Sequence, residues 1–136
     1  MTDESNSEET NSEETRMDAA RAVRRRVLGD AHVDRSRASA DDFSLEWQDF
    51  VTRQAWGAVW TRPGLSLRER SLMTLSILTA LGCEHELPLH VRGAITNGLT
   101  PDEIREVIMH AAVYAGIPAG NTAMAIAART LQENSD

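Results

Sequence analysis

Hydrophobic residues recur every three or four positions over most of the chain, which is the spacing of one face of an α-helix. The first such stretch covers residues 17–28 and stops at Gly29, a residue type that commonly ends helices. A second helix is predicted to begin at Asp41 or Asp42, because side chains that accept hydrogen bonds cap helix starts. We expect a turn over residues 56–64 to end it. Its apolar positions are Phe43, Trp47, Phe50, Val51 and Ala55.

Four further helices are predicted in the second half of the chain. One begins with a capping box, Ser66 followed by Glu69, and another begins with Thr100 before Pro101. No stretch alternates between apolar and polar residues as a half-buried strand would. The pattern therefore predicts an all-α fold, a single-domain bundle of about six helices. The expected ranges of these four helices are 66–81, 84–96, 100–115 and 118–133.

The first fifteen residues differ from the rest of the chain. They contain six acidic residues and no basic ones, and they repeat Asn-Ser-Glu-Glu-Thr at residues 6–10 and 11–15. Such a polar segment has too little apolar surface to order itself. We predict a disordered acidic tail over residues 1–15 and one helical domain over residues 16–136. Because the whole chain has a net charge of -7, the domain is nearly neutral, which gives no support for nucleic-acid binding.

Composition narrows the chemistry further. Every basic residue is an arginine, so catalysis through a lysine imine is excluded. The single cysteine, Cys83, excludes an internal disulfide and favours a reducing, cytoplasmic location. Residues 107–128 lack charged side chains, but Gly116 and Pro118 interrupt them, so we expect two buried helices and no membrane span. A small helical chain with this many apolar faces is expected to form a homo-oligomer.

The segment from Cys83 to His90 carries the first residues with catalytic potential. Glu86 and His90 are four positions apart, so their side chains share one face of the predicted helix. A carboxylate beside an imidazole fixes its tautomer and favours its protonated form, which suits a general acid or base. A solvated Glu–His surface pair has the same spacing. His85 is a rival acid that lies on a different face.

Arginine and tryptophan residues gather around the turn predicted at residues 56–64. Trp60 and Arg62 lie in that turn, and Arg68 and Arg70 lie at the start of the following helix. A guanidinium group binds a carboxylate through two parallel hydrogen bonds, and an indole ring offers a flat wall. These residues predict a pocket for a planar anion. The alternative is an ordinary turn followed by a solvated helix end.

A polar loop is predicted over residues 29–35. It could lie over a site as a lid and bring His32 and Arg35 to the substrate. Asp30, His32 and Asp34 alternate along this loop, and that spacing does not match a usual zinc site. No metal is therefore expected.

His110 and Tyr114 form another pair at helical spacing. They either reach the same site from a neighbouring helix, where Tyr114 would contact the substrate, or form a partly buried pair. No phosphate loop, dinucleotide fingerprint, nucleophile elbow or metalloprotease motif is present. Nothing indicates a nucleotide or a flavin.

Taken together, these segments resemble the carboxymuconolactone decarboxylase family. The resemblance extends in order over roughly residues 17–130, and its most specific parts are Gly-Asp-Ala-His-Val-Asp-Arg at residues 29–35 and Trp-Thr-Arg-Pro-Gly-Leu at residues 60–65. It implies an alkylhydroperoxidase D-like helical fold, no cofactor, and a homo-oligomer that is a trimer or a hexamer. The other matching parts are residues 56–59, 70–72, 86–90, 97–98, 103–104 and 114–119.

The resemblance also implies an activity, decarboxylation of 4-carboxymuconolactone to β-ketoadipate enol-lactone in the protocatechuate branch of aromatic catabolism. For this reaction we expect His90 to be the general acid, positioned by Glu86. Arg62 and Arg70 are expected to bind the carboxylates. The remaining expected substrate contacts are Trp60, His32, Arg35, His85 and Tyr114.

The same superfamily includes alkylhydroperoxidase D-like proteins, which use Cys-x-x-Cys and a histidine four residues after the second cysteine. In this chain Cys83 and His90 match the first cysteine and the histidine, but Glu86 stands at the second cysteine. An intramolecular dithiol cycle therefore cannot run. A reductase that uses Cys83 with an external thiol and a non-catalytic helical oligomer stay open as alternatives.

Overall fold

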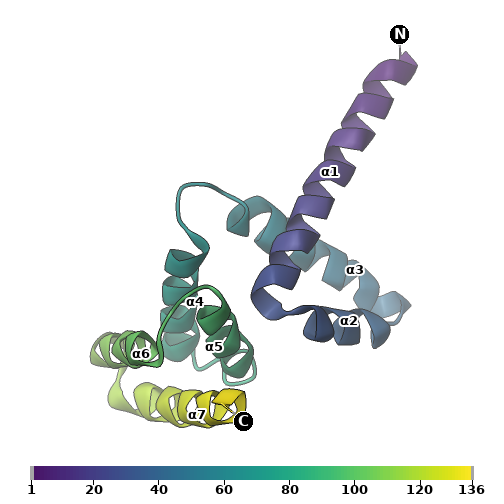
Figure 1. Cartoon of the computed structure of the whole chain (residues 1–136). Helices are drawn as coiled ribbons and strands as arrows, with labels where there is room; N and C mark the ends of the chain where they lie inside the picture. Colours follow the sequence, from purple (N-terminus) through teal and green to yellow (C-terminus); the bar gives the residue numbers. More distant parts are fainter. Residues whose placement is uncertain (1, 136) are drawn as a thin grey trace. The chain divides into compact units, whose positions relative to one another are not determined.

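A computed structural model of the chain describes the backbone of residues 2–135 and the side chains of residues 7–135. Over these residues the secondary structure consists of seven α-helices and one π-helical segment, without a strand (Figure 1). The predicted all-α fold is confirmed. The helices form two compact units, the first ending at Gly64 and the second beginning at Leu65.

The N-terminal unit has a small core between its first helix and its last. Ala20 and Val27 of α1 pack with Trp56 of η1. The two helices pass so close that a Cβ added to Gly57 would lie 3.2 Å from the Cβ of Ala20. The elements of this unit are α1 (Thr2–Leu28), α2 (Asp30–Ala38), α3 (Asp42–Val51) and the π-helix η1 (Thr52–Trp60).

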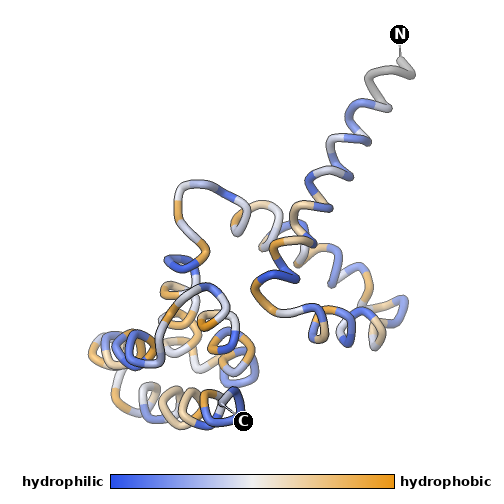
Figure 2. Tube along the Cα trace, in the orientation of Figure 1, coloured by the Kyte–Doolittle hydropathy of each residue, from blue (hydrophilic) through white to orange (hydrophobic). Residues whose placement is uncertain are grey.

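Helix α1 begins at Thr2, although a helix was expected only from residue 17. The side chains of residues 7–16 are all exposed, and the coloured turns near the start of the helix are mainly hydrophilic (Figure 2). A helix without a buried face depends on its backbone hydrogen bonds alone, which give marginal stability in water. The disorder predicted for residues 1–15 therefore stays a prediction, and residue 1 lies outside the described residues.

Two segments that were expected to be loops are helical. Residues 30–38 form α2, because Gly29 turns the chain at a φ of 88°, Asp30 places a negative charge in the first helical turn, and Val33 is buried. The turn expected from residue 56 begins only after Trp60, since η1 continues and buries Trp56. In both cases tertiary burial extends helical structure through residues that look polar or turn-like in sequence.

The helix predicted from Asp41 or Asp42 is confirmed, and Asp41 caps it by accepting a hydrogen bond from the Ser44 backbone N–H. Its apolar spacing is helical as expected. The large side chains, however, do not face a core within the unit, because Phe43, Trp47 and Phe50 are exposed. The rings of Trp47 and Phe50 stack with centroids 5.6 Å apart. This leaves an aromatic surface on the outside of α3.

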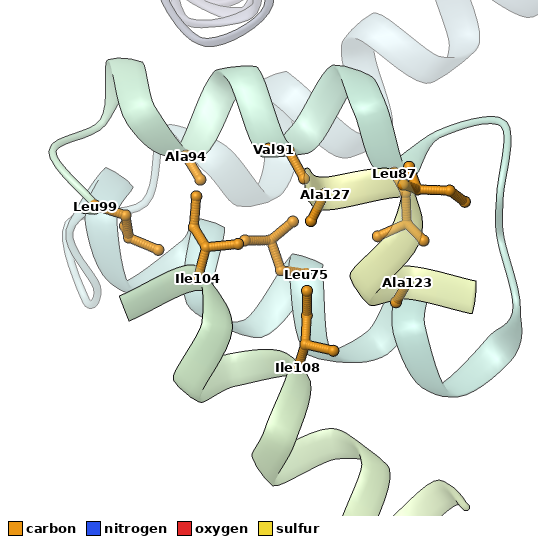
Figure 3. Packing of buried hydrophobic residues seen from close by; sticks show 10 residues of the cluster. Leu75, Leu87, Val91, Ala94, Leu99, Ile104, Ile108, Ala123 and Ala127 are labelled. Atoms are coloured by element: carbon orange, nitrogen blue, oxygen red, sulfur yellow. The ribbon is translucent and has the colours of Figure 1, made fainter. Parts of the chain in front are cut away.

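The C-terminal unit consists of four helices around one hydrophobic core. Leu75 of α4 is fully buried and lies among residues of the other three helices (Figure 3). Hydrophobic positions are concentrated along these helices (Figure 2). The helices are α4 (Leu67–Leu81), α5 (Leu87–Thr96), α6 (Pro101–Ala115) and α7 (Ile117–Ser135). The core contains Leu75, Leu87, Val91, Ala94, Leu99, Ile104, Ile108, Ala123, Ile126 and Ala127.

Most helix ends in this unit follow the sequence signals closely, although α5 starts at Leu87 and not at residue 84. Both predicted capping boxes are formed, Ser66 with Glu69 at α4 and Thr100 with Glu103 at α6. Helix α4 ends at Gly82 in the left-handed region, and α6 ends at Gly116, so residues 107–128 do form two helices. None of the helices in residues 2–135 combines the length and hydrophobicity that crossing a bilayer requires.

Candidate active site

The two residues predicted on the 29–35 loop are instead held on α2. His32 is half-buried, and its Nε2 lies 3.4 Å from the hydroxyl oxygen of Ser36. Arg35 is exposed on the same helix. A position on a helix fixes both side chains more firmly than a mobile loop would. The prediction of a loop is therefore wrong, while a covering role of this segment and the role of either residue as a substrate contact stay predictions.

Helix α2 is fastened to the end of α1 by a fork of charged hydrogen bonds. Arg25 donates from Nη1 to Asp30 at 3.2 Å and from Nη2 to Asp34 at 2.8 Å. These hydrogen bonds raise the pKa of the Arg25 guanidinium, and the bond to Asp34 contributes more than the bond to Asp30. Both acids of the predicted loop thus have a structural role here, as partners of Arg25.

Trp60 and Arg62 lie at the end of the π-helix and just beyond it. The rings of Trp60 and Trp56 have centroids 4.9 Å apart and an interplanar angle of 32°, with Trp56 buried and Trp60 half-buried. Arg62 is exposed in the following turn, where its backbone N–H donates to the Val59 carbonyl at 3.0 Å. The indole of Trp60 is thus held by a buried neighbour, as a rigid wall of a site would be. π-Helical segments frequently mark functional sites.

Glu86 and His90 keep their predicted spacing, but the helix that carries them starts later than expected. Helix α5 begins at Leu87, because residues 84–86 form a turn and Pro88 favours the first helical turn. Glu86 therefore stands at the N-cap, and its carbonyl accepts from the His90 backbone N–H at 3.1 Å. His90 is half-buried, while Glu86 and His85 are exposed. Contact between the Glu86 and His90 side chains stays a prediction.

Arg70 is buried in the first turns of α4, with only 7% of its surface exposed. Beside it Ser71 accepts a hydrogen bond from the Asn97 side-chain nitrogen at 2.9 Å, which ties the end of α5 to the start of α4. Arg68, by contrast, forms an ion pair with Glu103 of α6. Of these two arginines Arg70 is the one enclosed by the unit, as a binding residue should be. Asn97 was not predicted as a positioning residue, although its side chain forms the hydrogen bond that connects α5 with α4.

His110 and Tyr114 contact one another on α6. Their ring centroids are 5.3 Å apart with an interplanar angle of 36°, but both side chains are exposed, so the expected partial burial is wrong. His110 also lines an open groove of about 410 Å³ between α4 and α6. The groove is mainly apolar, and its other lining residues are Leu72, Met73, Ser76, Glu103, Glu106 and Val107.

The family of the chain follows from comparison with known proteins. The model of the carboxymuconolactone decarboxylase family matches residues 46–129, which is more than half of the chain. This chain belongs to the carboxymuconolactone decarboxylase family. The match begins within α3, so His32 and Arg35 on α2 lie outside it.

Relatives within the family extend the similarity to most of the chain. A protein of Acinetobacter baylyi named 4-carboxymuconolactone decarboxylase is 48% identical over 82% of this chain and 83% of its own length. A nitrosuccinic acid decarboxylase of Metarhizium robertsii is 44% identical over 84% of this chain and 80% of its own length. A third relative, a 4-carboxymuconolactone decarboxylase of Pseudomonas putida, is 55% identical over 29% of this chain and 83% of its own length.

Family membership bears directly on how Cys83 is interpreted. The chain has a single cysteine, which is half-buried in the turn before α5. A dithiol cycle needs a second thiol within reach, and Glu86 occupies the position where that thiol would stand. An intramolecular dithiol cycle therefore cannot run in this chain.

Proposed function

We propose that this protein decarboxylates 4-carboxymuconolactone to β-ketoadipate enol-lactone and carbon dioxide. The observation that carries the proposal is the 48% identity, over most of both chains, to the Acinetobacter baylyi protein of that name. A second decarboxylase shares 44% identity over a similar length. Both relatives are named for the loss of a carboxyl group, which supports the reaction class independently of the substrate.

The chemistry of the lactone makes a cofactor unnecessary. The bond between the γ-carbon and the departing carboxylate breaks, and its electron pair passes through the ring double bond towards the lactone carbonyl oxygen. The substrate itself therefore accepts the electron pair, so no cofactor is needed as an electron sink. The protein has to bind two carboxylates, stabilise the negative oxygen and supply one proton to a ring carbon.

His90 is proposed as the acid that supplies the proton. Its ordinary pKa range makes histidine a suitable acid near neutral pH. The half-buried position on α5 protects His90 from bulk solvent better than the exposed His85 next to the helix start. Glu86 at the N-cap is proposed to hold the imidazole in its protonated form. His85 is retained as a substrate contact.

We expect guanidinium groups to bind the carboxylates of the substrate, because the chain has arginines but no lysine. Arg70 is proposed for one of them, since it is buried in its unit and its neighbour Ser71 is fixed by Asn97. Arg62 is proposed for the other, next to the ordered indole of Trp60. Further contacts are proposed, as predicted from the sequence, for His32, Arg35 and Tyr114.

The test is a kinetic comparison of wild type with His90→Asn and Glu86→Gln, following the loss of carboxymuconolactone absorbance. Loss of an acid–base group typically costs about a hundredfold or more in rate, so His90→Asn should lower kcat by that amount. Glu86→Gln should have a smaller effect and should move the alkaline limb of the pH–rate profile to lower pH, because an amide no longer stabilises the imidazolium.

Gln132→Asn serves as the control, because Gln132 is an exposed residue of the same unit outside the proposed machinery. It should keep wild-type kinetics. If His90→Asn is folded, assembled as wild type and equally active, His90 is not the acid. A wild-type protein without any turnover of carboxymuconolactone would instead contradict the proposed function itself.

A second substrate deserves the same assay, because one relative is named for nitrosuccinic acid. Nitrosuccinate is also a dicarboxylate, and its nitro group would accept the electron pair that the lactone carbonyl accepts in carboxymuconolactone. Comparing kcat/KM for the two compounds distinguishes the candidates. A higher value for nitrosuccinate would reassign the substrate and leave the reaction class unchanged.

We also propose that the protein acts in the cytoplasm as a homo-oligomer, a trimer or a hexamer. Support comes from large side chains left exposed on two neighbouring helices of the C-terminal unit. They recur at steps of four residues, so each set forms one stripe along its helix. On α4 they are Met73, Ile77 and Leu81, and on α6 they are Met109 and Val113.

A further inference from the structure

Arg24 of α1 is a buried cation whose hydrogen-bond partners are all uncharged. Only 7% of its surface is exposed. Its Nη1 donates to the Thr52 hydroxyl at 3.2 Å, and its Nη2 donates to the Gln48 side-chain oxygen at 2.8 Å. Among the described residues its Nε–H has no acceptor. The guanidinium is therefore buried with one donor, its Nε–H, left without an acceptor in the part of the chain that the structure describes.

Two neighbouring arginines of α1 form ion pairs with carboxylates of this chain, whereas Arg24 forms none with the described residues. Arg21 pairs with Asp18, and Arg25 pairs with both Asp30 and Asp34, although these two arginines are much more exposed than Arg24. No ion pair with Arg24 is formed among the residues that the structure describes. The most buried arginine of the helix thus has no counter-charge within residues 7–135, while two more exposed ones do.

The electrostatic surroundings make this arrangement costly. Burial lowers the pKa of Arg24, and the positive charges of Arg37 and Arg25 lower it further. Arginine nevertheless stays protonated in proteins. Removing a charge from water without a compensating partner is unfavourable, so buried charges are normally paired. A positive field around a buried, incompletely bonded guanidinium is what an anion site requires before its anion arrives.

We propose that Arg24 binds a carboxylate that the chain itself does not supply, and that this is the substrate carboxylate proposed above for Arg62, which belongs to the same N-terminal unit. Thr52 and Gln48 hold the guanidinium plane in place, and the remaining N–H groups are left for a carboxylate, which accepts two of them at once. The assignment of the carboxylate to the substrate rests on the proposed function. The binding of a carboxylate by Arg24, whichever molecule carries it, does not depend on the proposed function.

The decisive comparison separates the charge of Arg24 from its structural bonds. Arg24→Met removes the charge, while the double variant Thr52→Val, Gln48→Met removes the two acceptors and leaves the charge. A charge-assisted hydrogen-bonded pair typically accounts for about tenfold to a hundredfold in binding. Arg24→Met should therefore lower kcat/KM for carboxymuconolactone by about that factor, mainly through KM. The double variant keeps the charge and should lose less of kcat/KM than Arg24→Met, because the guanidinium still attracts a carboxylate although its plane is no longer fixed.

Two further variants keep the test conclusive. Arg24→Lys retains a charge but not the fork and should fall between wild type and Arg24→Met, which also covers the case that Arg24→Met does not fold. Arg26→Met is the matched control, because Arg26 is an exposed arginine of the same helix, and it should match wild type. Equal losses in Arg24→Met and in the double variant would show a purely structural clamp and overturn the proposal.

A binding measurement without turnover distinguishes this proposal from the proposed function. Succinate, a non-reactive dicarboxylate, should raise the melting temperature of wild type more than its uncharged analogue succinamide does at equal ionic strength, and Arg24→Met should reduce the difference. The same result is expected even if carboxymuconolactone is not the substrate. No difference between the two ligands in wild type, or a smaller assembly of Arg24→Met with unchanged kcat/KM, would overturn the assignment to a substrate carboxylate.

Discussion

Gly120 sets how closely helices α6 and α7 approach one another, and Gly120→Ala tests that packing directly. A Cβ at residue 120 would lie 2.6 Å from the Cβ of Ala112 and 3.7 Å from its Cα. Carbon atoms in contact normally lie about 3.5–4 Å apart, so the helices would have to separate by about 1 Å. The Cβ of Ala112 is fixed to its backbone, and no side-chain rotation relieves the clash.

The expected magnitude is a balance of two opposing effects. Overpacking a core typically costs about 1–3 kcal/mol, while replacing glycine by alanine within a helix gains about 0.5–1 kcal/mol. Gly120 is buried, and the clashing atom belongs to the facing helix, which places the cost in the upper part of its range. The free energy of unfolding should therefore fall by about 1–2 kcal/mol.

Urea unfolding of a double-mutant cycle measures this. Ala112→Gly removes the facing Cβ, so the double variant Ala112→Gly, Gly120→Ala should be more stable than the sum of the single effects by at least about 1 kcal/mol. Gly64→Ala is the matched control, since a Cβ there meets nothing within 4 Å. If Gly120→Ala is as stable as wild type, or the cycle shows no coupling, the close approach of α6 and α7 is not as described.

Three more predictions test separate parts of the molecule. Cys83→Ala should keep most of the activity and cost at most about 1 kcal/mol of stability; a loss of several orders of magnitude in a folded variant would revive the thiol-dependent reductase. Hydrogen bonds from Ser66, at the start of α4, lower the pKa of Glu69 below its usual 4.5, so its carboxylate stabilises the fold above that pH and less as the pH falls. Glu69→Gln should accordingly be less stable than wild type in urea at pH 7, and the difference should shrink as the pH falls below 4.5; a difference independent of pH would contradict this. Ile77→Asp should reduce the size of the assembly in sedimentation velocity, whereas the exposed Gln132→Asp should not; equal assemblies would exclude the α4 stripe from the interface.

The helix ends of the C-terminal unit could be predicted from the sequence because local chemistry determines them. Ser66 and Thr100 form capping boxes whose partners lie three residues further on. Gly82 and Gly116 adopt positive φ values that other residue types disfavour. In each case the deciding interaction lies within one turn of the chain, so no knowledge of the tertiary structure was needed.

The errors occurred where distant contacts decide the local structure. Residues 30–38 are polar, and their helix depends on burial of Val33 and on the bonds of Arg25 to Asp30 and Asp34. The π-helix continues through Trp60 because Trp56 packs against α1. Phe43 had the right spacing for a core position, yet it is 93% exposed. Periodicity shows which residues share a face of a helix, but not whether another element covers that face.

The same limit explains why the sequence did not single out Arg24. It stands in a run of three identical residues, and each has a different environment in the structure. Arg24 is buried with uncharged partners, Arg25 bridges two aspartates, and Arg26 is exposed. Helix geometry produces this difference, because successive residues point about 100° apart around the axis. Only the position of η1 and α3 against α1 determines which of the three is enclosed, so a composition rich in arginine becomes a specific anion site only once the helices are packed.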